Sequence, residues 1–314
     1  MKQFYFLISF LLVSLFASAQ NAPFITTWTV SSSDGLNIII PTQGTGYNYT
    51  IDFGDGTVEN NVSGDAFHTY SSSGTYTVSI TGNFPRIRFR NFATSNMPLK
   101  INSVEQWGDI QWQSMEGAFA RCSYLSFNAT DIPDLTLVTS MSYMFSQAAF
   151  FDSQINNWDV SNITDMSYIF SNAYDFDQPL NNWNVSNVTN MSHMFYRAQN
   201  FNNPIENWDV SNVTNMEAMF VQTDYNYPLN SWDVSSVTNM SMMFATSEYN
   251  QPLNSWDVSN VTDMSYMFTD FADNFAGADF NQPLDNWDVS NVVNMKKMFE
   301  YTHYNQPLNN WDVS

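Results

Sequence analysis

One pattern of apolar positions returns about every 25 residues through the second half of the chain. Tryptophan marks it, with successive intervals of 25, 25, 24, 24, 31 and 24 residues. The tryptophan column consists of Trp158, Trp183, Trp208, Trp232, Trp256, Trp287 and Trp311. The other apolar positions keep fixed offsets and, around Trp183, are Phe176, Leu180, Val185, Val188, Met191 and Phe195. A period of this length is typical of repeat proteins whose coils stack on one another.

The spacing inside each repeat predicts its local structure. Trp183 and Val185 alternate around a polar residue, which predicts a short strand, and Val188 can begin a second one. Residues 191–198 place Met, Met, Phe and Ala at three-and-four spacing, which predicts a helical turn. The prolines of the QPL and NPI segments cannot donate to a ladder, so they belong in the turn before the tryptophan strand.

These repeats predict an α/β repeat solenoid over residues 114–314. A unit of about 25 residues cannot bury seven large side chains by itself, so neighbouring coils must share them. Each buried Trp, Phe or Met contributes roughly 1.5–3 kcal/mol, which makes the columns the main source of stability. The Met and Trp columns are therefore interpreted as core and not as a ligand site.

The N-terminus has the pattern of an export signal. Lys2 is followed by FYFLISFLLVSLF and then by ASA, which ends at Ala19. This order predicts a secretory signal peptide over residues 1–19. No later segment reaches 18 consecutive apolar residues, so no transmembrane segment is expected. We therefore expect a protein that is secreted or held at the cell surface.

Residues 20–84 change to a period of two with turn residues between the runs. The DG pair after YNYTIDFG predicts a hairpin, so this module is expected to be a small all-β sandwich. Asp52, Asp55 and His68 fit either of two roles. They can form part of a calcium site, or the carboxylates can organise the turn through backbone hydrogen bonds while the histidine packs beside a tyrosine. Residues 85–113 are expected to join the module to the coils and cap the first coil.

Two stretches resemble known families. YTIDFGDGTV followed by HTYSSSGTYTVSI resembles a PKD-type domain, which implies an immunoglobulin-like sandwich that acts as a spacer or binding module. SMEGAFARCSYL, residues 114–125, resembles the bacterial leucine-rich repeats of the BspA-like type, and the WDVSNVTNMSxMF units resemble their sister repeat. This resemblance implies a leucine-rich-repeat-like solenoid, with short strands and a short helical turn per coil, and a surface role that is often adhesive.

The charge of the chain limits its partners. Thirty acidic and nine basic residues give a formal net charge of −21, which disfavours nucleic acid and anionic membranes and favours cations or basic protein surfaces. No HExxH, Walker, GxSxG or CxxC motif is present, and the three histidines occur in different contexts. The only cysteine, Cys122, occupies a core column, so neither an internal disulfide nor a thiol nucleophile is expected. We expect no catalysis.

One polar column follows each tryptophan. Its members are Asp159, Asn184, Asp209, Asp233, Asp257 and Asp288. Stacked coils would place neighbouring carboxylates about 4.8 Å apart, where they repel by about 0.9 kcal/mol even in water. Backbone amides of the following turn can offset this repulsion. The alternative is a basic partner surface or a line of calcium ions, with Asp209, Asp233, Asp257 and Asp288 as the metal ligands. A second column, which includes Asn162, Asn187 and Asn212, is predicted as a turn ladder.

One coil carries seven extra residues in the segment TDFADNFAGADFN. Its aromatic and acidic residues suit a protein patch that bears Lys or Arg, and binding residues are common in loops on a rigid scaffold. The candidate binding residues are Phe271, Phe275, Asp270, Asp273 and Asp279. In the alternative interpretation, the loop merely covers its own coil. The sequence stops at WDVS in mid-coil, so we expect it to be part of a longer protein.

These features predict an exported binding or adhesion protein that presents a repeat solenoid to a protein or extracellular-matrix ligand. One alternative is a structural spacer that presents a C-terminal domain absent from this sequence. Another is an extracellular carbohydrate-active enzyme. A contiguous exposed aromatic patch would favour binding, whereas an evenly polar surface would favour the spacer.

Overall fold

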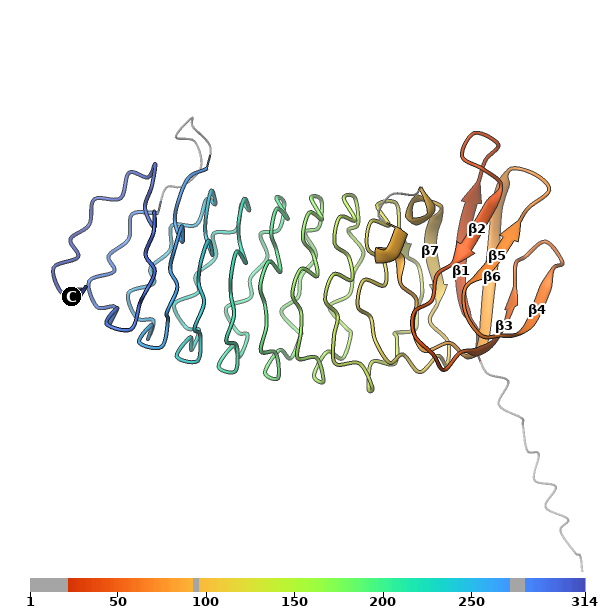
Figure 1. The fold of residues 1–314 in the computed structure, drawn as a ribbon, viewed down its shortest axis with the longest axis horizontal. Coiled ribbons are helices and arrows are strands. Elements are labelled where there is room, and N and C mark those ends of the chain that lie inside the picture. The colour runs from red at the N-terminus through yellow and green to blue at the C-terminus, as the bar shows by residue number, and fades with distance from the viewer. Residues whose placement is uncertain (1–21, 93–95, 272–279, 314) are drawn as a thin grey trace, which may run out of the picture.

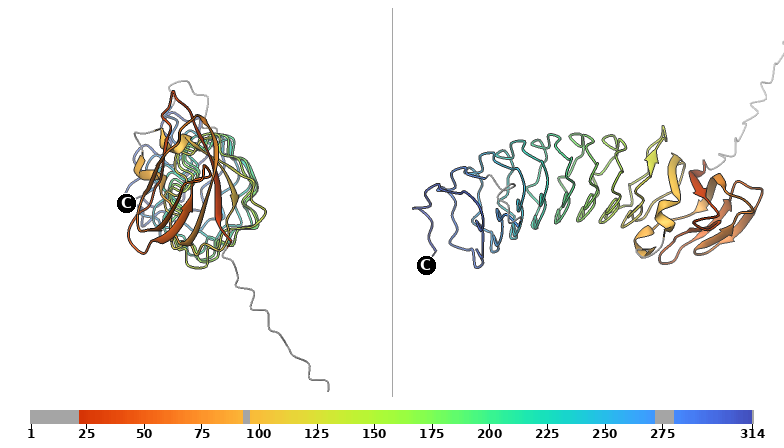
Figure 2. Two further views of the ribbon diagram at one scale, coloured as in Figure 1. Left: turned by 90° about the vertical axis from the view of Figure 1, so that its right-hand side faces the viewer. Right: turned by 90° about the horizontal axis from the view of Figure 1, so that it is seen from above.

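The protein is elongated, with a β module at one end and a stack of coils that extends from it (Figure 1). The computed structural model describes residues 22–92, 96–271 and 280–313. Viewed along the long axis, the coils lie behind one another with similar outlines (Figure 2). The predicted signal peptide, residues 1–19, lies outside the described residues. In the part of the chain that is described, no helix has the length and apolar character needed to cross a membrane.

Two β-sheets form the N-terminal module, as the period-two pattern predicts. The larger sheet has the order β4-β3-β6-β1-β7-β8 and the smaller one pairs β2 with β5. The strands are β1 (Phe24–Val30), β2 (Asn37–Ile40), β3 (Asn48–Asp52), β4 (Val58–Val62), β5 (Ala66–Thr69), β6 (Gly74–Asn83), β7 (Ile101–Gln106) and β8 (Ser126–Phe127). Alternate residues are buried along β1, where Phe24 and Trp28 face the core. The expectation of an all-β N-terminal module is consistent with this arrangement.

The predicted hairpin joins β3 to β4 through the turn that contains the DG pair. The two strands pair antiparallel, with Asp52 opposite Val58. Gly54 in this turn has a φ of +79°, and a Cβ there would lie 2.2 Å from the Thr77 carbonyl oxygen of β6. Only glycine fits such a close backbone approach in a left-handed conformation.

Strand β7 connects the module to the first coil. It pairs antiparallel with β1 and parallel with β8, so the large sheet extends into the coils. The Trp107 ring packs against Phe24 of the module and against Phe119 and Trp158 of the coils, at centroid distances of 5.4–6.1 Å. Module and coils therefore share one hydrophobic core. The predicted division at residues 84 and 113 stays a prediction.

The predicted α/β class is wrong for the coils. The described residues contain no α-helix, and their only helical segments are two short 3₁₀ turns, η1 (Phe89–Phe92) and η2 (Met97–Leu99). The predicted strands at the tryptophans are also missing. Successive coils are linked by single parallel bridges at another position of the repeat. The bridges run from Ser140 through Asp165, Asn190, Asn215, Asn239 and Asp263 to Asn294. The coils are built from turns and bridges, and the protein is nearly all β.

Hydrogen bonds between coils explain why the helical turn does not form. We number the coils from the one with Phe119; the second contains Phe145, the third Phe170 and the fourth Phe195. Alternate backbone amides of one coil donate to the next coil. In the second coil the donors are Met141, Tyr143, Phe145 and Gln147, and the acceptors are the carbonyls of Asp165, Ser167, Ile169 and Ser171, at 2.7–3.0 Å. An amide that donates to the next coil cannot also maintain the α-helical bond to the carbonyl four residues back.

The amides between these donors bond within the coil. Met144 and Ser146 donate to the carbonyls three residues earlier, at 3.1 Å. This alternation is accompanied by a left-handed backbone at two positions in the coil, Tyr143 with φ 59° and Gln147 with φ 60°. The same two positions are left-handed in the third coil, at Tyr168 and Asn172. Left-handed residues cannot continue a right-handed helix, although the Met and Phe side chains still face inward.

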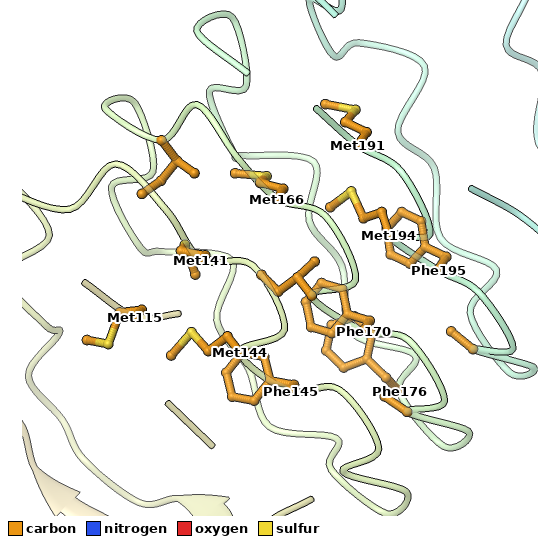
Figure 3. Packing of buried hydrophobic residues seen from close by; sticks show 14 of the residues in the cluster. Met115, Met141, Met144, Phe145, Met166, Phe170, Phe176, Met191, Met194 and Phe195 are labelled. Carbon is orange, nitrogen blue, oxygen red and sulfur yellow. The ribbon is translucent and has the colours of Figure 1, made fainter. Parts of the chain in front are cut away.

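Stacked side chains fill the space inside the coils. Figure 3 shows Met141, Met144 and Phe145 of the second coil beside Met166 and Phe170 of the third coil and Met191, Met194 and Phe195 of the fourth. The Phe145 and Phe170 rings stack with centroids 5.7 Å apart. Each repeat tryptophan from the second onward also donates its indole N–H to a carbonyl of the preceding coil. These pairs are Trp183 with Ile155, Trp208 with Leu180, Trp232 with Ile205, Trp256 with Leu229, Trp287 with Leu253 and Trp311 with Leu284, at 2.9–3.2 Å.

Replacing Trp208 with alanine should therefore destabilise the protein by about 3–5 kcal/mol. The change removes a side chain that is 4% exposed and leaves the Leu180 carbonyl without its indole donor. Asn207→Ala, at the exposed neighbouring position, should cost less than about 1 kcal/mol. Chemical denaturation of both variants measures the difference, and equal unfolding free energies would refute the shared core between coils.

Candidate functional site

A row of stacked rings follows one corner of the first coils. The first left-handed position of each coil carries Tyr143, Tyr168 and His193 in the second to fourth coils. Tyr143 and Tyr168 stack with centroids 4.4 Å apart, and Tyr168 and His193 stack at 4.2 Å. The Arg90 guanidinium lies over the Tyr143 ring, 3.3 Å from its centroid. The row is therefore closed by a cation–π contact at the end near the N-terminal module.

A groove of about 570 Å³ runs beside this row. Small buried residues, one per coil, form its floor, and the side chains of the second left-handed position form the opposite wall. The floor residues are Ala120, Ser146 and Ser171, and the wall residues are Arg121, Gln147 and Asn172. Tyr196 occupies the floor position of the fourth coil, where a large ring replaces the small residues. The residues that line the hollow come from the first four coils and include Met242 of the sixth coil.

The groove has an unusual charge for such an acidic protein. No acidic side chain is present among its described lining residues. Arg121 makes no side-chain hydrogen bond or ion pair within the described chain, whereas Arg90 lies 3.6 Å from Glu116. Burial lowers the pKa of His193 to about 4, so the imidazole is neutral at neutral pH. The free positive charge of the groove therefore belongs mainly to Arg121.

Hydroxyl and amide groups supply the other polar contacts of the groove. Burial, with smaller effects from Tyr143 and Glu217, raises the pKa of Tyr168 to about 12, so its phenol stays protonated. Asn172 donates to the Ser171 hydroxyl at 3.0 Å, and Gln147 is exposed. The groove thus offers groups that can both donate and accept hydrogen bonds.

An exposed aromatic patch borders the polar wall of the groove. Tyr124 is 61% exposed, Phe150 55% and Tyr174 37%, and they lie on three successive coils. The rings of Tyr124 and Phe150 stack with centroids 5.5 Å apart. Leu99, 45% exposed, lines a smaller hollow together with Arg121 of the groove wall. We call Leu99, Tyr124, Phe150 and Tyr174 the aromatic patch.

The structure places only part of the predicted insertion site. Phe271 is 51% exposed, with its ring 5.9 Å from that of Tyr266. Asp270 is buried, and its amide donates to the Glu300 carbonyl at 3.0 Å. The other candidate residues, Asp273, Phe275 and Asp279, lie outside the described residues. The insertion therefore stays a predicted binding site.

The aspartate column forms hydrogen-bonded turns. The side-chain oxygen of each column residue, a carboxylate except at Asn184, accepts the backbone amide of the serine two residues later. Asp209, Asp233, Asp257 and Asp288 do so at 3.1 Å. The hydroxyl and the amide of Ser235 hold the pKa of Asp233 below its usual value. In the described ranges, no group of three or more His, Cys, Asp or Glu side chains is arranged to hold a metal ion.

The asparagine column forms the predicted ladder. Each side-chain amide donates to a backbone carbonyl of the preceding coil, as Asn187 does to Ser161 at 2.7 Å and Asn212 to Ser186 at 2.8 Å. Cys122 is fully buried, and burial raises the pKa of its thiol well above the usual value.

In the N-terminal module, the candidate calcium residues take part in the turn. Asp52 accepts the Gly54 amide at 2.8 Å, and Asp55 accepts the Thr57 amide at 3.0 Å. Asp55 also contacts Nε2 of His68 at 2.8 Å, and this bond is the main cause of its lowered pKa. The His68 ring stacks on Phe53 and meets Tyr70 edge-on.

Sequence reasoning missed the groove and the ring row. The available signal was the change from Ala120, Ser146 and Ser171 to Tyr196 at one repeat position. A helical turn gives no reason to place the Ser146 position beside the aromatic Tyr143 position three residues earlier, so the predicted turn hid the groove.

Calcium should have little effect on the melting temperature, because turn hydrogen bonds already satisfy the aspartate column. Asp233→Asn keeps an oxygen acceptor and should change the unfolding free energy by less than about 0.5 kcal/mol. Thermal melts with calcium and with a chelator test this. A large calcium-dependent rise in melting temperature that Asp233→Asn and Asp257→Asn abolish would contradict it.

His193 should make stability depend on pH. Its folded pKa of about 4 lies below the ordinary value of 6.5, so the unfolded chain binds a proton first as the pH falls. The stability that the neutral His193 contributes to the folded state is complete above pH 6.5 and is lost as the pH falls toward 4. His193→Phe keeps a ring against Tyr168 and removes the titration. Denaturation between pH 7 and 4 should show a smaller loss of stability for the variant, and parallel curves would contradict the assignment.

Comparisons with known families agree with the two-part organisation. The PKD domain family matches residues 16–85, and PKD domains are typical of extracellular proteins. No curated protein and no solved structure matches the chain. A second family matches residues 113–226, 200–278 and 222–314, which together cover more than half of the 314 residues. The chain therefore belongs to the family described as Mycoplasma protein of unknown function, DUF285.

Proposed function

We propose that this protein is an exported binding protein that uses the face of its first three coils to contact a protein or extracellular-matrix ligand. The aromatic patch carries the proposal. Exposed large apolar residues that lie together mark interaction sites, whereas scattered ones need no explanation. Tyr124, Phe150 and Tyr174 occupy successive coils, and two of the rings stack on each other. The patch therefore has one exposed aromatic ring on each of three successive coils.

The surroundings of the patch support contact with a large partner. Aromatic residues dominate the energetics of protein interfaces, and arginine commonly accompanies them. Here Arg121 lines the same small hollow as Leu99 of the patch. The backbone under the patch is tied to the preceding coil, because Asp175 donates to the Ala149 carbonyl at 3.0 Å. A rigid aromatic surface loses little conformational entropy on binding.

A pure spacer is the less favoured function. A spacer needs no clustered aromatic side chains, and an evenly polar surface would keep it soluble. The similarity of the N-terminal module to PKD domains fits an extracellular location, which the predicted signal peptide also supports. The resemblance of the coils to BspA-like leucine-rich repeats supports an adhesive role. The function we propose is binding without catalysis.

Binding can be tested with the chain from residue 20 to 314 immobilised on a biosensor surface. The probes are fibronectin, laminin and type I collagen. We expect at least one of them to bind. Affinity should fall as salt rises, because a chain with a net charge of −21 attracts basic surfaces partly through screened charges. An affinity that does not change with salt would refute the proposed electrostatic attraction between the acidic chain and its ligand.

Variants then locate the surface. Tyr124→Ser and Phe150→Ser should each weaken binding about tenfold, as expected for aromatic side chains at the centre of an interface. Val293→Ser is the control, since Val293 is 86% exposed but lies on a distant coil. All three variants should melt like the parent chain. If none of the probes binds, or if the control weakens binding as much as the patch variants, the proposal is wrong.

A further inference from the structure

We propose that the groove beside the ring row binds an acidic oligosaccharide of two or three sugar rings, with its acidic group at Arg121. This inference deepens the proposed binding function, on which it rests, by naming a ligand class for the same coil face. The groove of about 570 Å³ lies within the roughly 300–1,000 Å³ of small-ligand sites. Its lining residues come from the first four coils and from Met242 of the sixth, and at about 4.8 Å per coil this length accommodates a short linear chain.

Charge complementarity selects an anion. The chain carries 30 acidic residues, yet none is among the described residues that line the groove. Arg121 is partly exposed on the groove wall and has no ion-pair partner within the described chain. Its guanidinium can therefore make charge-assisted bonds to a carboxylate or sulfate. Arg90 is less available to an anionic ligand, because Glu116 is 3.6 Å away and the Tyr143 ring covers its guanidinium.

The backbone of the groove argues against an extended peptide. A peptide that adds to an edge needs unpaired amides and carbonyls. Along the groove, the amides of Tyr143 and Gln147 donate to the Ser167 and Ser171 carbonyls of the next coil. The Tyr143 carbonyl accepts the Ser146 amide at 3.1 Å. A peptide main chain would find few partners here, so recognition must use side chains.

The side chains that remain suit sugar hydroxyls. Hydroxyl groups donate and accept at once, and planar amides such as Gln147 and Asn172 offer both functions. The protonated phenol of Tyr168 and the hydroxyls of Ser146 and Ser171 add further groups of the same kind. The ring row contributes the apolar part of the site. This mixture of polar and aromatic groups fits an acidic sugar better than a purely ionic ligand.

Isothermal titration of the chain from residue 20 to 314 tests the proposal with matched probes. The first pair is the trimer of galacturonic acid and its methyl ester, which differ in charge and little in shape. The second pair is 3′-sialyllactose and lactose, and a hexaglutamate peptide represents acidic peptides. We expect at least one acidic sugar to bind at least tenfold tighter than its neutral counterpart and than the peptide.

Three variants identify the site. Arg121→Gln should weaken binding of the acidic sugar at least tenfold. Arg197→Gln is the matched control, because Arg197 occupies the same coil position, bonds to Gln222 and does not line the groove. Ser171→Tyr places in the third coil the side chain that Tyr196 places in the fourth, so it should fill the groove and abolish binding without a change in charge. Melting temperatures show whether each variant is folded.

The outcomes separate this inference from the proposed function. Failure of both acidic sugars to bind, equal binding of a neutral counterpart, or tighter binding of hexaglutamate overturns the groove assignment. Equal weakening by Arg121→Gln and Arg197→Gln also overturns it. If the chain binds a matrix protein through its aromatic patch but binds no acidic sugar, the proposed function stands and only the groove inference is wrong.

Discussion

Hydrogen bonds between successive coils are the interaction on which this structure depends. Alternate amides of a coil donate forward to the next coil, and in most coils two of the donating residues adopt a left-handed backbone. Such a conformation costs about 1–2 kcal/mol for a residue other than glycine. Tyr168 and Asn172 adopt it, and their amides donate to the Ser192 and Tyr196 carbonyls of the next coil, which helps to offset this cost. The conformation of each coil is therefore stabilised by its neighbour and not by its own sequence alone.

The side chains that line the interior were predictable, but the backbone that carries them was not. The columns that contain Trp208 and Phe195 require only that large apolar residues return at a fixed period, and both residues are buried as expected. Spacing of three and four fits a helix and also fits these left-handed turns. Gly117 marks the left-handed position in the first coil, but Tyr143 and Tyr168 in the next coils have no intrinsic preference for it. The helical turn was therefore the wrong choice between two arrangements with the same inward face.

The same error concealed the groove. Its floor depends on one residue per coil, and its walls depend on two left-handed positions that bring Tyr143 and Gln147 to either side of Ser146. A helical turn would direct these three side chains differently. By contrast, the turn role of Asp233 and the ladder role of Asn212 follow from local hydrogen-bonding preferences, which do not depend on how the rest of the coil folds.

Dependence of each coil on the next gives the stack a definite mechanical character. A coil without a following neighbour has no acceptors for its forward amides, although Lys297 and Tyr301 of the last described coil keep a left-handed backbone without them. Repeat arrays of this kind are quasi-one-dimensional, and their loss of structure starts most easily at an end. One coil occupies about 4.8 Å of the stack, whereas its 25 or so residues extend to about 80 Å when pulled straight. A tethered chain under tension would therefore lengthen in steps from its end, while the interior coils kept their shape.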